Sequence, residues 1–430
     1  MTVDPLPDWF PGYGAGGIRW GLERTEALLA GVGNPHRRFH SVHIAGTNGK
    51  GSVAALCDAA LRASGRHRVG LYTSPHLVSF TERVRIDGIP VAADALRDAA
   101  ERLRPLIERT GASFFEATTV LALLCFADAD VNVAVVEVGL GGRLDATNVI
   151  TPVAVAITNI ALDHAEYLGS TLPEIAREKA GILKPGVPAV TAERDSGLLK
   201  LLRVHAAQVG ASLAPLEELT EVLSAEARAD GVRVHFRSAA WGERTLQAPL
   251  RGTHQVRNAL LASELLAPLP PDLRPGWDDV QRGFATVRWP GRLQIEQIRG
   301  TTWVLDVAHN PAGAEALASS LEPLELPRPA VLVMAVLGDK AWPEMLDAIV
   351  PKADAAILTL ASSAPPDRRW DPREAAEHVM RTTGRRPRII SELGDALERA
   401  ATLAPHGSVL VAGSFHTVGD AMQHLGISPF

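Results

Sequence analysis

The chain has 430 residues, with 43 Lys and Arg against 49 Asp and Glu, 46% hydrophobic residues and two cysteines. This length exceeds what one core usually holds, and the formal net charge of −6 argues against a broad nucleic-acid-binding surface. No run approaches the roughly 18 consecutive apolar residues of a membrane helix, and the first residues show no signal-peptide pattern. We therefore expect a cytoplasmic protein of two or three domains, without a nucleic-acid or membrane partner.

Over residues 1–300, apolar strand-like runs alternate with helical patterns, which is typical of an α/β domain with a mostly parallel sheet. The runs that predict buried strands are SVHIA (41–45), VNVAVVEVGL (131–140) and PVAVAITNI (152–160). A helix is expected over 170–183, with Thr171 as its cap and Pro173 in its first turn. The irregular, alternating stretch around 211–250, which contains VRVHFR, predicts an antiparallel edge.

A second alternation of strands and helices follows the Trp-Pro-Gly turn at 289–291, and it predicts a second α/β domain. Its expected strands are WVLDVA, AVLVMAVL, AAILTLA, RII and SVLVAGS. We place the boundary near 293, which divides the chain into domains 1–293 and 294–430.

The two cysteines predict no disulfide. Cys57 and Cys125 each lie on the apolar face of an expected helix, in GSVAALCDAALRASG and ATTVLALLCFA. We interpret both as small buried side chains, which fits a reducing compartment.

A glycine-rich turn, AGTNGKGSV at 45–53, stands between an expected strand and an expected helix. Backbone amides of such a turn and the positive end of a helix form an anion cradle, and Lys50 can reach bound phosphates as a point charge. The strict P-loop pattern fails, because its first Gly would fall at Ile44 and Gly51 separates Lys50 from Ser52. The strand–turn–helix context favours a nucleotide-phosphate site over an incidental flexible turn.

Possible metal ligands stand at or near the expected carboxyl ends of strands. Ser74 follows VGLYT, Glu137 lies inside AVVEVGL and His164 follows the strand of NIALDHAEYLG. A lone buried Glu or His is more often structural. A carboxylate within an apolar parallel strand is nevertheless costly unless it is paired or metal-bound, and open α/β sheets bind ligands at this edge. Together these residues favour Mg²⁺ ligation.

Further motifs run in order through nearly the whole chain. They are GLERTEALLAGVGNP (21–35), HIAGTNGKGSV (43–53), YTSPHLVSFTERVRIDG (72–88), FFEATT (114–119), VVEVGLGGRLDATNVITP (135–152), ALDHAEYLGSTLPEIAREKAGILKPGVP (161–188), RGTHQVRNAL (251–260), RWPGRLQ (288–294), LDVAHNPAGA (305–314), GDK (338–340) and GSFHTVGDA (413–421). This set resembles the bacterial folylpolyglutamate synthase/dihydrofolate synthase family of the Mur ligase superfamily. The resemblance implies an N-terminal P-loop NTPase-like domain with a mostly parallel sheet and a C-terminal Rossmann-like α/β domain.

The resemblance also implies roles for individual residues. Those implied to bind ATP are Gly49, Lys50, Gly51, Ser52, Asn258, Arg292 and Asp306. Those implied to surround Mg²⁺ are Ser74, Glu137 and His164. Those implied to border the pterin substrate are Thr47, Asn48, Phe115, Glu116, Leu144, Asp145 and Ala146. The implied catalytic residues are Lys50, Lys179 and His309, with His309 in the family's interdomain cleft near phosphate or glutamate.

Two of these implied roles have structural alternatives. The resemblance makes Lys179 the family's carbamylated lysine, and it is one of only six lysines in an arginine-rich chain. Without the resemblance, Lys179 reads as a charge at a helix C-terminus, where it favours the helix dipole. Asp145 is implied to recognise the pterin, but a loop carboxylate can also cap its own turn.

The implied activity is ATP-dependent ligation of L-glutamate to dihydropteroate and to reduced folates through an acyl phosphate, by a monomer. One alternative is a folylpolyglutamate synthase without the dihydropteroate activity. A cell-wall Mur-type amino-acid ligase is disfavoured, because only 45 residues precede Gly46, too few for the extra domain of those enzymes. A nucleotide-binding regulator without ligase activity is disfavoured by the presence of Lys179, His164 and Asp306.

Overall fold

The computed structural model describes residues 5–12 and 20–430, and it divides into two compact units. Unit 1 runs to Ala225 and also includes Val234–Ala248 and Arg257–Val287. Unit 2 contains Arg288–Phe430 together with two short segments, Glu226–Arg233 and Pro249–Val256. The single boundary near 293 stays a prediction.

Unit 1 is built on an eight-stranded, mostly parallel sheet with the order β4-β3-β2-β5-β1-β6-β7-β8. The pairs from β2 to β8 are parallel, and β3 and β4 add antiparallel partners at one edge. The strands are β1 His40–Ala45, β2 Val69–Tyr72, β3 Val84–Ile86, β4 Ile89–Pro90, β5 Val133–Glu137, β6 Ala154–Ile157, β7 Pro188–Thr191 and β8 Ser212–Pro215. The three strands predicted in this region are therefore confirmed as β1, β5 and β6.

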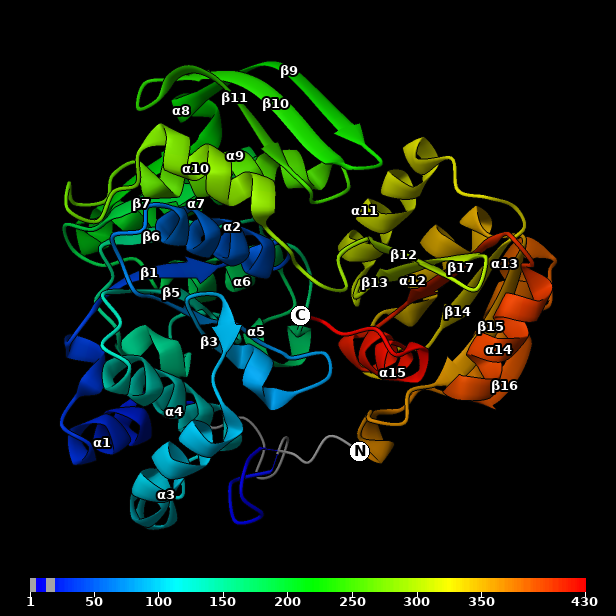
Figure 1. Cartoon of the computed structure of the whole chain (residues 1–430), viewed down its shortest axis with the longest axis horizontal. Helices are drawn as coiled ribbons and strands as arrows, with labels where there is room; N and C mark the ends of the chain where they lie inside the picture. The colour runs from blue at the N-terminus through cyan, green and yellow to red at the C-terminus, as the bar shows by residue number, and fades with distance from the viewer. Residues whose placement is uncertain (1–4, 13–19) are drawn as a thin grey trace. The chain divides into compact units, whose positions relative to one another are not determined.

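Helices cover both faces of this sheet (Figure 1). The helices of unit 1 are α1 Glu23–Gly31, α2 Lys50–Ala63, α3 Ala93–Thr110, α4 Phe114–Asp128, α5 Ala165–Leu168, α6 Leu172–Ala180, α7 Ser196–Val209, α8 Leu216–Leu219, α9 His254–Leu266 and α10 Trp277–Thr286. One buried cluster joins α1, α3 and α4 to β5, and another joins α6 and α7 to β6. Helix α10 packs closely on α2 at Gly283, where a Cβ would lie only 2.5 Å from the backbone of Ala59.

A separate three-stranded sheet follows β8, with the order β11-β10-β9. Its strands are β9 Thr220–Arg228, β10 Gly231–Ser238 and β11 Gly242–Ala248. Most of the stretch around 211–250, predicted as an antiparallel edge, instead forms this separate sheet, and VRVHFR lies in its middle strand, β10. Buried and exposed residues alternate along β10, because one face of this sheet packs on α10 and the other faces solvent. The alternation of apolar and polar residues in the sequence has this origin.

Unit 2 contains a six-stranded sheet with the order β12-β13-β17-β14-β15-β16, parallel except for the β12–β13 pair. The strands are β12 Gln294–Ile298, β13 Thr301–Asp306, β14 Ala330–Met334, β15 Ala355–Leu360, β16 Arg388–Glu392 and β17 Ser408–Ala412. The helices are α11 Pro311–Leu321, α12 Trp342–Ile349, α13 Pro372–Thr383, α14 Leu393–Leu403 and α15 Phe415–Leu425. All five strands predicted here are confirmed, and the two α/β sheets confirm the predicted fold class.

Local sequence signals are also confirmed. Helix α6 begins after Thr171, whose side chain and that of Glu174 form a capping box, with Pro173 in the first turn. Cys57 in α2 and Cys125 in α4 are buried free thiols, and burial raises the pKa of both.

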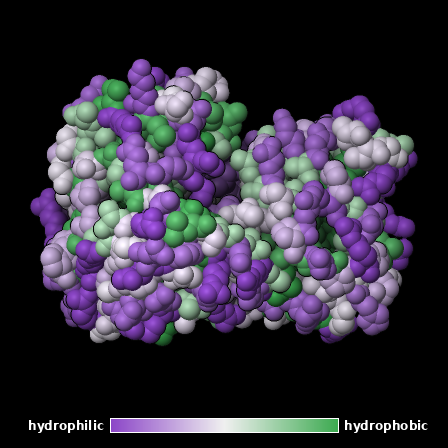
Figure 2. All heavy atoms as spheres, turned by 90° about the horizontal axis from the view of Figure 1, so that it is seen from above, coloured by the Kyte–Doolittle hydropathy of each residue, from purple (hydrophilic) through white to green (hydrophobic). Residues whose placement is uncertain are grey.

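On the face shown in Figure 2, hydrophobic residues stand in small groups among hydrophilic ones. No helix within residues 5–12 and 20–430 is long and apolar enough to span a membrane.

Candidate active site

The glycine-rich turn joins the end of β1 to the start of α2, as predicted. Gly49 is the N-cap of α2 with a left-handed φ of 85°, and Lys50, Gly51 and Ser52 form the first turn of the helix. Because the first amides of a helix have no partners within it, this turn presents N–H groups and the positive helix end to an anion. The geometry supports a phosphate cradle.

Two lysines from distant parts of the chain converge on this turn. Lys50 Nζ donates to the carbonyl oxygens of Gly46 (3.2 Å) and Thr47 (3.1 Å). Lys179 Nζ, from the last turn of α6, donates to the same Gly46 carbonyl at 2.7 Å. One backbone oxygen therefore accepts hydrogen bonds from both lysine side chains at the loop.

Lys179 lies in an environment that disfavours its positive charge. Its side chain is buried, with 4% exposed. Burial, and then the positive charge of Lys50, lower the pKa of Lys179 from 10.5 to about 7, against a smaller opposing effect of Asp163. At pH 7 a large fraction of the Lys179 amine is therefore uncharged. A solvated lysine at a helix end would be almost fully protonated at this pH.

The other end of the turn contacts α9. A Cβ at Gly49 would lie 2.6 Å from Asn258 Oδ1, so only glycine allows this close approach. Asn258, predicted to bind ATP, is therefore placed at the phosphate turn. Thr47 and Asn48 are hydrogen-bonded to the segment that follows β6, through the Ala161 carbonyl oxygen and Asn159 Oδ1.

The predicted metal ligands Ser74 and Glu137 lie together. Ser74 follows β2 and its amide donates to Glu137 Oε2 at 3.1 Å, while Glu137 ends the adjacent parallel strand β5 and is 5% exposed. A buried carboxylate beside a serine is a donor set that Mg²⁺ prefers, so these two residues fit a divalent cation.

His164 is placed less tightly than these two residues. It follows β6 at the same edge of the sheet, is half-buried and has a φ of 51°. Its Nε2 lies 3.8 Å from Asp163 Oδ1. No three His, Cys, Asp or Glu side chains converge within the described part of the chain, and the predicted set contains only two such residues.

On the predicted pterin side, two acidic residues are engaged in local structure. Glu116 completes the capping box of α4, accepting from the amide and hydroxyl of Ser113 (2.7 Å each), and pairs with Arg24 Nε at 2.9 Å. Phe115 packs at Gly139, where a Cβ would lie 2.1 Å from its ring.

The loop 144–146 carries the second of these carboxylates. Asp145 Oδ2 accepts from Leu140 N at 2.7 Å, and Oδ1 accepts from the amide (3.0 Å) and hydroxyl of Thr147. Asp145 is therefore the cap of its own turn in this structure, and burial raises its pKa. Leu144 beside it is partly exposed, and Ala146 is buried.

In unit 2, three predicted residues gather where β13 ends. Asp306 Oδ2 and Oδ1 accept from the amides of Leu293 and Ala308, both at 2.8 Å. Burial raises the pKa of Asp306, and the positive charge of Arg292 opposes that effect.

Aromatic contacts complete this group. Arg292 lies 5.4 Å from the ring centre of Phe415, and the His309 ring lies 5.5 Å from it. Phe415 was not predicted as a site residue, although it stands in the GSFHTVG motif directly after a strand end. Its ring therefore contacts both Arg292 and His309 close to the end of β13.

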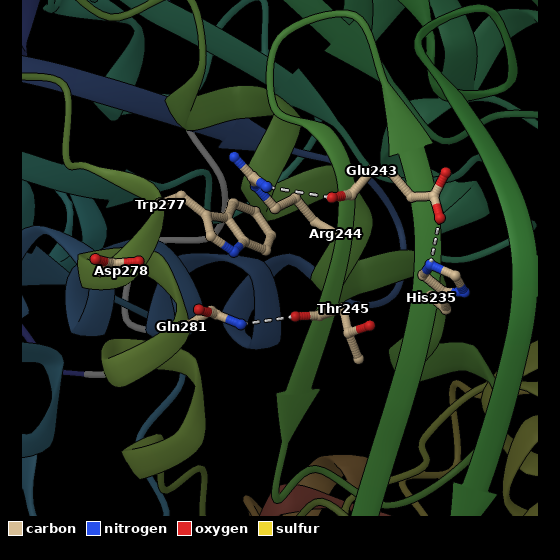
Figure 3. Close-up of a pocket in the computed structure, with 7 residues that line it drawn as sticks. All are labelled: His235, Glu243, Arg244, Thr245, Trp277, Asp278 and Gln281. Atoms are coloured by element: carbon tan, nitrogen blue, oxygen red, sulfur yellow. Dashed lines mark hydrogen bonds and ion pairs between the residues drawn. The ribbon is translucent and has the colours of Figure 1, made fainter.

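A shallow cavity of about 500 Å³ lies between β10, β11 and α10 (Figure 3). None of the predicted site residues lines this cavity. The residues that line it are His235, Glu243, Arg244, Thr245, Trp277, Asp278 and Gln281. Several of its polar groups are paired with one another, such as Gln281 Nε2 with Thr245 O and His235 with Glu243.

Comparison with known proteins identifies the family. Residues 44–266 match the Mur ligase middle domain, and residues 291–415 match the Mur ligase glutamate ligase domain. The dihydrofolate synthase/folylpolyglutamate synthase of Mycobacterium tuberculosis is 36% identical over 94% of this chain and 86% of that relative. The chain belongs to the folylpolyglutamate synthase/dihydrofolate synthase family. The family model and these relatives confirm the predicted ATP-dependent ligase that forms carbon–nitrogen bonds.

Solved structures agree with this assignment. Folylpolyglutamate synthase of M. tuberculosis complexed with ADP and AMPPCP has a TM-score of 0.87, at 36% identity over 96% of this chain and 97% of that one. E. coli FolC in complex with DHPP and ADP has a TM-score of 0.84, at 30% identity over 94% and 93%. A bifunctional enzyme with Mn, AMPPNP and L-glutamate bound has a TM-score of 0.82, at 31% identity over 95% of each chain.

Some relatives are longer than this chain. A probable bifunctional folylpolyglutamate synthase/dihydropteroate synthase of Haloferax volcanii is 36% identical over 94% of this chain, which spans about half (48%) of that relative.

Proposed function

We propose that this chain ligates L-glutamate to dihydropteroate, forming dihydrofolate, and to reduced folates, forming polyglutamates, with conversion of ATP to ADP and phosphate. The same proposal includes a monomeric, cytoplasmic enzyme. Relatives named for both activities, and structures named for complexes with DHPP, nucleotide, Mn and L-glutamate, support it.

The observation that carries the proposal is the pair of lysines on the Gly46 carbonyl. Lys50 is placed to bind phosphate charge at the N-terminus of α2. In the proposed reaction, a substrate carboxylate attacks the γ-phosphorus of ATP, which gives an acyl phosphate and ADP. The glutamate amine then attacks the acyl carbon, and inorganic phosphate leaves as the amide forms.

Such phosphoryl transfer needs positioning and charge compensation more than covalent help from the protein. Lys50 and the amides of Gly49 to Ser52 supply positive charge on one side. Ser74, Glu137 and His164 would hold Mg²⁺, which would neutralise phosphate charge when bound. Asp306, Arg292 and His309 supply a second, separate set of groups in unit 2 for ATP and glutamate.

We further propose that Lys179 is carbamylated. A bare ammonium near a cation site is electrostatically unfavourable. Addition of CO₂ to the neutral amine forms an N–C bond and releases one proton, which leaves an anionic carbamate whose oxygens can bind a cation. The lowered pKa supports this step, because only the neutral amine reacts. Lys179→Ala should lose most ligation and regain part of it with acetate or formate. Full activity of Lys179→Ala without any additive would contradict carbamylation.

The experiment that tests the main proposal is mass spectrometry of the products formed from ATP, L-glutamate and either dihydropteroate or tetrahydrofolate. We expect both acceptors to gain glutamate, with ADP released only when glutamate and an acceptor are present. Absence of product from both acceptors would refute the proposed function.

One observation favours a narrower function, folylpolyglutamate synthase alone. Both oxygens of the Asp145 carboxylate are used inside its own turn, which leaves less capacity to recognise a pterin. Addition of glutamate to tetrahydrofolate without any reaction of dihydropteroate would establish that narrower function.

A further inference from the structure

The segment that follows β6 is hydrogen-bonded to the backbone of the phosphate turn. Asn159 accepts from two consecutive amides of the turn, through its carbonyl oxygen from Thr47 N at 2.8 Å and through Oδ1 from Asn48 N at 2.9 Å. Thr158 Oγ1 donates to the Asn48 carbonyl oxygen at 2.6 Å. Asn48 is therefore held at its N–H by one residue and at its C=O by the other.

These bonds determine where the following amide points. A trans peptide unit is planar, so the N–H of Gly49 is directed opposite to the C=O of Asn48. The cis bonds found among the described residues lie elsewhere, at Ser74–Pro75 and Arg328–Pro329. Because Thr158 holds the Asn48 carbonyl on its own side, the Gly49 N–H faces away from Thr158, at the N-cap of α2.

Close packing gives the Thr158 hydroxyl little freedom to move. Thr158 is 2% exposed, and a Cβ at Gly46 would lie only 1.8 Å from Thr158 Oγ1. The absence of a side chain at Gly46 thus makes room for this hydroxyl against the turn. The bond to Asn48 is built into the junction between β1 and β6 and does not depend on a mobile surface side chain.

We propose that Thr158 and Asn159 are positioning residues for nucleotide binding, which hold the Asn48–Gly49 peptide so that the Gly49 N–H faces the phosphates. This inference rests on the proposed function, which places ATP phosphates at Gly49–Ser52. Neither residue was among the predicted site residues. An amide that is already oriented loses no freedom when the anion binds, so the contact contributes its full strength.

The test compares Thr158→Val, which removes the hydroxyl at similar volume, with Thr158→Ser, which keeps it. We expect Thr158→Val to raise the Kd for ADP, measured by calorimetry, and the KM for ATP by about tenfold, as for one charge-assisted hydrogen bond. The KM for L-glutamate, which the proposal assigns to residues of unit 2, should stay unchanged, and Thr158→Ser should keep nucleotide binding. A merely structural role would lower the melting temperature without this split between the two substrates.

Thr25→Val is the matched control, because Thr25 in α1 is fully buried and its hydroxyl has no hydrogen-bond partner within the described residues. It should leave the ADP affinity unchanged. If Thr158→Val does not fold, Asn159→Ala removes the bond to the Asn48 amide and should weaken ADP binding in the same way.

Two negative results are distinguishable. Wild-type ADP affinity in folded Thr158→Val or Asn159→Ala protein would overturn the positioning role and leave the proposed function intact. Absence of ADP binding by the wild-type protein would instead refute the proposed function itself, and the positioning role with it.

Discussion

Replacing Lys179 by methionine should change how stability depends on pH. The amine has a pKa of about 7 in the folded protein against 10.5 when solvated. Between these values the unfolded chain binds more protons than the folded one, so raising the pH stabilises the wild type. Below about pH 7 the amine is protonated in both states, and its contribution becomes constant.

The size of the effect follows from these two values. The full difference of about 3.5 units corresponds to roughly 5 kcal/mol, and the part that falls between pH 6 and pH 9 is about 2–3 kcal/mol. Lys179→Met cannot titrate, and its loss of the bond to Gly46 adds an offset that does not depend on pH. The wild type should therefore gain about 2–3 kcal/mol relative to the variant from pH 6 to pH 9.

Urea unfolding in CO₂-free buffer measures this difference, because contributions of other titrating groups cancel between the two proteins. Lys200→Met, at an exposed lysine in α7, is the control and should show a difference that is flat with pH. A flat or falling difference for Lys179→Met would refute the neutral amine. Added bicarbonate should reduce the slope if the amine is carbamylated.

The other variants test the turn and the cap of α4. Lys50→Ala should fold but lose ATP-dependent ligation, measured as ADP release, and Lys50→Arg should also fail because a planar fork replaces a point charge; normal turnover of either would remove Lys50 from the phosphate site. Gly49→Ala should weaken ADP binding at least about tenfold in calorimetry, since its Cβ meets Asn258 Oδ1 and its φ is left-handed; unchanged affinity would argue against the close approach of Gly49 to Asn258. Glu116→Ala should lower the free energy of unfolding in urea by about 1–3 kcal/mol, because the α4 cap and the Arg24 pair are both lost, and a change below about 0.5 kcal/mol would show that the cap contributes little.

Local signals in the sequence predicted the elements well. The capping box at Thr171, the apolar strands and the glycine turn each depend on residues only a few positions apart. The structure therefore has these elements where the sequence predicted them. The register of VRVHFR depends on which segments pair with it, and alternation alone does not distinguish a middle strand from an edge. The assignment of Glu226–Arg233 and Pro249–Val256 to unit 2 likewise depends on tertiary contacts, which composition does not show.

The site was predictable in its residue types and less so in its connections. The glycine turn indicated Lys50 directly, but the bond from Lys179 to Gly46 spans 133 positions and exists only in the folded chain. Asp145 carried two interpretations, and its hydrogen bonds favour the structural one. Thr158 and Asn159 gave no separate signal, because the pattern that marks a buried strand end does not show which carbonyl a hydroxyl will reach.

Isotope transfer decides whether ligation proceeds through an acyl phosphate. Tetrahydrofolate with ¹⁸O in both oxygens of its γ-carboxyl group would be incubated with ATP, L-glutamate and the enzyme, and the inorganic phosphate would be analysed by mass spectrometry. We expect one labelled oxygen in each phosphate released, because the attacking carboxylate oxygen leaves with phosphorus. Unlabelled phosphate alongside glutamylated product would contradict the acyl-phosphate mechanism.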